Sequence, residues 1–217
     1  MTIDGAVNKS MILVALTLVA AMFTYRQSGV SSSVVMVTGI LGFIIALIAS
    51  FNPASTPVTA PLYAIVEGLF LGAVSYAFGD MYDGIVLQSV MLTFGTLFGM
   101  LGLYSFGIIR MSAGLSRFLF VATAGVAITY LLTFILGLFN VQVPFIHDSG
   151  PIGIGFSAFV VILAALNLIG DFATIESGAA QGAPKYMEWY SAFGLLVTLV
   201  WLYLEILRLL AKLRSRD

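Results

Sequence analysis

Three carboxylic acids stand inside or at the edge of apolar stretches in a sequence that otherwise has few charges: Glu67, Asp171 and Glu205. An acid in the hydrocarbon of a bilayer costs roughly 2.5–3.5 kcal/mol on insertion scales, so such acids usually face a polar interior. Carboxylate oxygens accept protons and bind hard cations such as calcium. These three residues are therefore the first candidates for a proton or cation path.

Asp171 comes one helical turn after Asn167, which places a carboxylate and an amide on the same face of a helix. Oxygens of this kind suit calcium, although one pair is far from a shell of roughly six to eight oxygens. The structural alternative is an acid at the membrane surface, solvated by water among the lipid headgroups. The sequence leaves both interpretations open.

Glu205 is followed three residues later by Arg208, a spacing at which a helix brings the two side chains together. One interpretation is a simple ion pair within the helix. In the functional interpretation, Glu205 exchanges its contact with Arg208 for a proton or a second acid. If Glu205 faces Asp171, only one of the two is easily charged, because like charges oppose each other's ionisation. Such a pair would respond to pH.

Glu67 lies near the middle of an apolar run beside Gly68 and Gly72, which are four residues apart. This small-residue stripe predicts that another helix approaches closely beside the acid. Glu67 is then either a neutral packing acid, hydrogen-bonded across a helix interface, or a ligand of the cation path.

The elements that carry these acids are predicted to be membrane-spanning helices. The chain has 217 residues, of which 60% are hydrophobic and 9% charged, and its mean hydropathy of +1.09 is that of an integral membrane protein. Barrel strands alternate between polar and apolar residues, whereas these runs are apolar on every face. We therefore expect an all-α bundle of seven helices in a single domain, residues 1–217. The runs are Met11–Thr24, Val34–Phe51, Val58–Phe78, Ile85–Phe106, Phe118–Phe139, Pro151–Gly170 and Tyr190–Leu210.

Between the runs, polar, glycine and proline residues predict short turns. The first run is expected to extend backward past Lys9. The longest connection is predicted over Phe172–Trp189, where Gly182, Ala183 and Pro184 argue against a continuous helix. Lysine and arginine are divided almost evenly between the two sides, so the orientation stays open.

The glycines of the fourth run are expected to serve close helix packing. They are Gly95, Gly99 and Gly102.

Several classes of function are disfavoured by the residues that are missing. A net charge of −1 offers no basic surface for nucleic acid, and the absence of cysteine and the presence of one histidine, His147, disfavour a resident metal or haem cofactor. A serine protease within the membrane needs a histidine base near its nucleophile, so Ser157 is interpreted as a packing residue. An aspartyl protease within the membrane needs two aspartates in separate runs, and only Asp171 is available here. We expect no enzyme activity.

Three segments together resemble the Bax inhibitor (transmembrane Bax-inhibitor-motif) family of small multi-span proteins. They are Glu67-Gly68-Leu69-Phe70-Leu71-Gly72, Asn167-Leu168-Ile169-Gly170-Asp171-Phe172 with Ile175-Glu176, and Tyr203-Leu204-Glu205-Ile206-Leu207-Arg208-Leu209-Leu210. With the span count, the resemblance extends over nearly the whole chain, and the order and spacing of the segments make it specific.

The resemblance implies a seven-helix bundle with the last helix central, acting as a pH-sensitive calcium leak. In the family, two acids on the sixth and seventh helices share a proton and gate the pore. Asp171 matches the first of these acids. The second is usually an aspartate preceded by tyrosine and an apolar residue, so Glu205 matches it by position and not by residue type.

The chain departs from the family in a second respect. Some members hold the acidic pair with an arginine of the second helix, but Val34–Phe51 contains no charged residue. Arg26 or Arg208 would have to take the place of that arginine, or the chain lacks it.

The leading hypothesis is therefore a calcium or other cation leak across the bilayer of a bacterial plasma membrane, gated by protonation of Asp171 and Glu205, with Glu67, Asn167 and Arg208 along the path. Asp171 and Glu205 are the predicted metal-binding acids, and calcium is the transported ion. The main alternative is a non-conducting membrane protein that regulates a partner, such as a membrane protease or a stress-response complex. A third is a proton-coupled exporter of small solutes.

Overall fold

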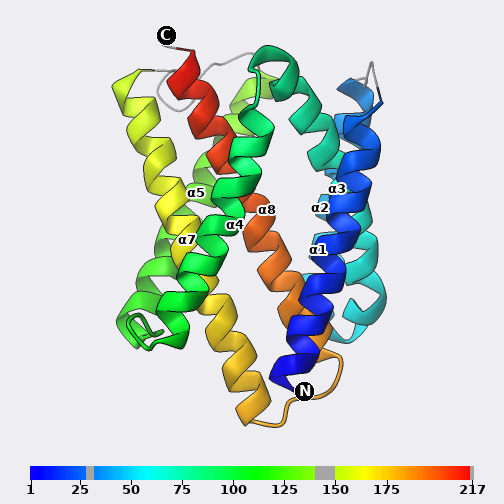
Figure 1. The fold of residues 1–217 in the computed structure, drawn as a ribbon, viewed down its shortest axis with the longest axis vertical. Helices are drawn as coiled ribbons and strands as arrows, with labels where there is room; N and C mark the ends of the chain where they lie inside the picture. Colours follow the sequence, from blue (N-terminus) through cyan, green and yellow to red (C-terminus); the bar gives the residue numbers. More distant parts are fainter. Residues whose placement is uncertain (28–31, 140–149, 216–217) are drawn as a thin grey trace. The chain divides into compact units, whose positions relative to one another are not determined.

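The structure is a computed structural model that describes residues 1–27, 32–139 and 150–215, and these residues form helices and no strand (Figure 1). Among them, seven helices are long and apolar enough to cross a membrane. The helices are α1 (Ile3–Tyr25), α2 (Ser32–Phe51), the short 3₁₀ helix η1 (Pro53–Ser55), α3 (Thr56–Met81), α4 (Ile85–Ser105), α5 (Ala113–Leu138), α7 (Pro151–Ala180) and α8 (Met187–Arg214). The predicted all-α membrane bundle is confirmed.

Helices are the expected elements because a bilayer offers no water to backbone groups, so each span must satisfy its own N–H and C=O groups. The hydroxyl groups on α1 follow the same rule. Ser10, Thr17 and Thr24 donate to carbonyl oxygens four residues earlier in the helix, at 2.9, 3.0 and 3.3 Å. These buried polar side chains therefore need no partner on another helix.

The ends of two helices differ from the prediction. The connection expected over Phe172–Trp189 is only residues 181–186, because α7 continues to Ala180 and α8 begins at Met187. The small residues near the end of α7 continue the helix, and the break comes at Gly182, whose φ of 63° is left-handed. The backward extension of the first run is confirmed, since α1 begins at Ile3.

The chain divides into two compact units, which share α7 and α8. Unit 1 consists of residues 1–86 and 171–200, and unit 2 of residues 87–170 and 201–217.

In unit 1, α3 packs against α1 at its glycines. A Cβ at Gly68 would lie 2.5 Å from the carbonyl oxygen of Thr17, and one at Gly72 would lie 2.3 Å from that of Ala21. Any side chain at these positions would force the helices apart. The close approach predicted from the stripe beside Glu67 is confirmed.

In unit 2, the core joins α5 to the first part of α7. Leu119 and Val126 of α5 and Val160 and Leu163 of α7 are buried together, and Trp201 of α8 is among the residues packed against them. Among the described residues of unit 2, the glycines of α4 have no such close neighbours. Within this unit, nothing lies within 4 Å of a Cβ built at Gly95, Gly99 or Gly102, so their predicted role in close packing is not met here.

Candidate functional site

Glu205 is the most deeply buried of the three predicted acids, with 1% of its surface exposed. Its Oε1 accepts hydrogen bonds from the Tyr130 hydroxyl of α5 at 2.9 Å and from Arg208 Nη1 at 2.8 Å. Arg208 Nη1 also donates to the Tyr130 hydroxyl at 2.8 Å, and its guanidinium carbon lies 5.0 Å from the centre of the Tyr130 ring. We call these three residues the Glu205 network.

The second oxygen of Glu205 is different. Oε2 is buried and has no hydrogen-bond partner among the described residues. A buried carboxylate oxygen without a donor is costly, whereas a bound proton or cation would satisfy it. The ion pair expected between Glu205 and Arg208 is present, and it leaves half of the carboxyl group available for that chemistry.

Asp171 lies well inside α7 and not at its end, because the helix continues for nine further residues. In unit 1 it lies against α8: a Cβ at Gly194 would be 3.6 Å from Asp171 Oδ1, and the Thr198 hydroxyl, which donates to the Gly194 carbonyl oxygen at 3.2 Å, lies beside it. Its Oδ2 is buried without a partner among the described residues. The structure therefore places Asp171 against Gly194 and Thr198 of α8.

Glu205 follows Thr198 by seven residues, so both side chains lie on one face of α8, about 10 Å apart along its axis. Asp171 belongs to unit 1 and Glu205 to unit 2. The sharing of one proton by Asp171 and Glu205 stays a prediction.

Asn167 uses its amide group within unit 2. Its Nδ2 donates to the Thr123 hydroxyl of α5 at 3.0 Å and to the Leu163 carbonyl oxygen of its own helix at 2.9 Å. This nitrogen joins α7 to α5. The predicted role of Asn167 as an oxygen ligand stays a prediction.

Glu67 is packed between α3 and α2 in unit 1. It is 8% exposed, and a Cβ at Gly42 of α2 would lie 2.6 Å from Glu67 Oε2. The carboxyl group therefore occupies space that a glycine leaves open. The role of Glu67 in a cation path stays a prediction.

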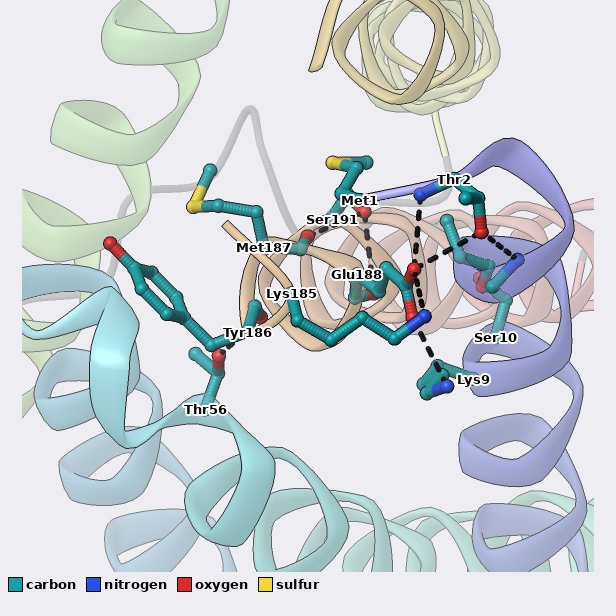
Figure 2. Close-up of polar contacts among 12 residues, drawn as sticks. Met1, Thr2, Lys9, Ser10, Thr56, Lys185, Tyr186, Met187, Glu188 and Ser191 are labelled. Atoms are coloured by element: carbon teal, nitrogen blue, oxygen red, sulfur yellow. Dashed lines mark hydrogen bonds and ion pairs between the residues drawn. The ribbon is translucent and has the colours of Figure 1, made fainter. Parts of the chain in front are cut away.

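Two parts of the polar interior were missed by sequence reasoning. Tyr130 gives no signal in sequence, since one tyrosine in an apolar run is usually a packing residue. Glu188 lies at the start of α8, where it contacts Thr2, Lys9 and Lys185 (Figure 2). The spacing of three residues between Lys185 and Glu188 could have predicted their ion pair. The sequence contained no indication of the contact between Glu188 and α1.

Ser157 is more than the packing residue predicted from sequence. Its side chain is buried and accepts a hydrogen bond at 2.9 Å from Lys212 of α8, which also donates to the Gly153 carbonyl oxygen at 3.0 Å. His147 lies outside the described residues. In the part of the chain that the structure describes, no group of three or more histidine, cysteine or acidic side chains is placed to hold a metal ion.

A family model described as Bax inhibitor 1 like matches residues 1–215. The chain belongs to this family. The match covers the segments with Glu67, Asp171 and Glu205, and it agrees with the resemblance found in the sequence. No curated protein and no solved structure matched the chain. As a Bax inhibitor family member with seven apolar helices among its described residues, the protein is an integral membrane protein.

Proposed function

We propose that this protein is a pH-sensitive leak for calcium or another cation, and that protonation of Asp171 and Glu205 closes it. The observation that carries the proposal is the state of Glu205, which is almost fully buried and has one oxygen held by Tyr130 and Arg208 and the other without a donor among the described residues. Ionisable groups of this kind inside membrane helices commonly mark ion and proton paths.

The physical argument concerns the charge of the two acids. When deprotonated, Asp171 and Glu205 attract cations and supply oxygen ligands. When protonated, they are neutral and favour a closed, apolar interior. Because Asp171 contacts Thr198 and Glu205 follows on the same face of α8, we propose that the two acids are coupled through this helix.

The test is calcium flux into proteoliposomes loaded with a calcium-sensitive dye, measured across a pH series from acidic to mildly alkaline. The unmodified protein should conduct more as pH rises. Asp171→Asn and Glu205→Gln, which mimic the protonated acids, should conduct little at every pH. Asp80→Asn is the matched control, because Asp80 is an exposed acid at the end of α3, and it should behave like the unmodified protein.

Two results would reject the proposal. An unmodified protein without flux would not be a leak, and a partner that copurifies with it would then favour the non-conducting regulator. Flux that keeps its pH dependence in Asp171→Asn and Glu205→Gln would exclude these acids as the gate. Replacing calcium by magnesium or potassium in the same assay identifies the ion. A path selective for calcium should conduct magnesium less, because magnesium gives up its water reluctantly.

A further inference from the structure

Glu188 is a fully buried acid in the first turn of α8, at the end of a membrane span. Figure 2 shows its carboxyl group between the start of α1 and the connection that precedes α8. Its Oε1 accepts from the Thr2 backbone N–H at 3.0 Å, the Thr2 hydroxyl at 3.1 Å and Lys185 Nζ at 2.8 Å. Lys9 Nζ lies 3.1 Å from Oε2. We call these four residues the Glu188 cluster.

The first turn of α1 is shaped to receive this carboxyl group. A Cβ at Gly5 would lie 2.2 Å from Glu188 Oε1, so only glycine admits the acid at this position. Thr2 is also the N-cap of α1, where its hydroxyl oxygen accepts from the Gly5 N–H at 3.0 Å. One threonine therefore caps α1 and ties it to α8.

The two lysines differ in a way that can be tested. The side chain of Lys9 is 23% exposed and that of Lys185 is 73% exposed, while both reach the same buried acid. An ion pair with an exposed partner contributes little, because water screens it and the side chain loses freedom. Lys9, which also lies 5.9 Å from the centre of the Trp189 ring, should be the lysine that matters.

Stability alone does not account for an acid at this position. Removing charges from water costs energy that apolar residues of similar size would avoid, so a buried ion pair is weak evidence for stability. What the cluster does supply is direction: the backbone N–H and the hydroxyl of Thr2 both donate to Oε1 and Lys9 of α1 lies against Oε2, so these contacts fix where α8 begins relative to α1.

The same helix carries Glu205 and Arg208 of the Glu205 network. Glu205 follows Glu188 by 17 residues in the continuous helix α8, a rise of about 25 Å. We propose that Glu188 is a positioning residue for the ion path: by fastening the start of α8 to α1, it holds this helix in the position that the closed path requires when Asp171 and Glu205 are protonated. This inference rests on the proposed function.

The experiment has two measurements, so that the fastening and the ion path are tested separately. The first measures the distance between spin labels on Asp4→Cys and Gln181→Cys, two exposed sites of unit 1 in a chain without native cysteine. Glu188→Gln and Lys9→Met should broaden the distance distribution, and Lys185→Met, the matched control, should leave it unchanged. Unchanged distances in both Glu188→Gln and Lys9→Met would overturn the fastening.

The second measurement is calcium flux under acidic conditions, where the unmodified protein is closed. Glu188→Gln should raise the leak about tenfold, the change that corresponds to 1.4 kcal/mol. This substitution keeps the shape of the side chain, and Lys9→Met provides an independent variant should Glu188→Gln fail to fold. Altered label distances with an unaltered leak would show that Glu188 is only structural. A wild-type protein without flux would overturn the proposed function and the role of Glu188 in it, whereas the label distances would still decide the fastening.

Discussion

Replacing Gly72 by alanine is the sharpest test of the contact between α1 and α3. The added Cβ would lie 2.3 Å from the Ala21 carbonyl oxygen and 2.9 Å from Thr24 Cβ. Ordinary contacts begin at 3.4 Å, so α1 and α3 would have to separate locally by about 1.1 Å (3.4 − 2.3). The Ala21 carbonyl oxygen belongs to the backbone, so it cannot rotate away as a side chain could. Overpacking of this kind costs about 1–3 kcal/mol.

Gly99→Ala is the matched control, because it makes the same substitution inside a helix where, within unit 2, nothing lies within 4 Å of the new Cβ. Alanine favours a helix over glycine by roughly 1 kcal/mol at either position, so this gain cancels in the comparison. Thermal unfolding in detergent should place the melting temperature of Gly72→Ala below that of Gly99→Ala by roughly 2–12 °C. Equal melting temperatures would refute the close contact between α1 and α3.

Three further changes test contacts of unit 2 by the same thermal assay. Tyr130→Phe removes a hydroxyl that donates to Glu205 and accepts from the charged Arg208, so we expect a loss of about 1.5–3 kcal/mol; a melting temperature equal to that of the unmodified protein would contradict these contacts. Thr123→Val removes the acceptor of Asn167 on α5 and should cost only about 0.6 kcal/mol, and no more than roughly 1.7. Lys212→Met removes the ammonium group that donates to the Ser157 hydroxyl and the Gly153 carbonyl oxygen of α7. We expect it to lower the melting temperature more than Thr123→Val does, and the reverse order would contradict these contacts.

The fold was largely predictable, because length and apolarity alone define membrane helices. Spacing also predicted the contact at Gly68 and Gly72, since two glycines four residues apart leave a groove on one face of a helix. The same pattern failed at Gly95 and Gly99, where nothing approaches within unit 2. A small-residue stripe shows where a helix can approach, but the choice of partner depends on contacts between distant segments.

The site was predictable only where its contacts are local. Glu205 and Arg208 are three residues apart, so helix geometry alone brings them together. Tyr130 meets them from 75 residues away in the sequence. Thr2 meets Glu188 from 186 residues away. Sequence pattern contains no information about pairings at such distances.

The distribution of charge along α8 bears on how this helix could move. Its polar contacts come at the start, where Glu188 meets α1, and in the second half, where Glu205 meets α5 and Lys212 meets α7. Lipid provides no hydrophobic force that holds helices together, so hydrogen bonds and close packing set their positions. Protonation of Glu205 removes the charge that Arg208 pairs with and leaves the bonds of Glu188 in place. In the proposed mechanism, a pH change would therefore act on the second half of α8 while the contacts of Glu188 at its start stay in place, so the helix would tilt without leaving α1.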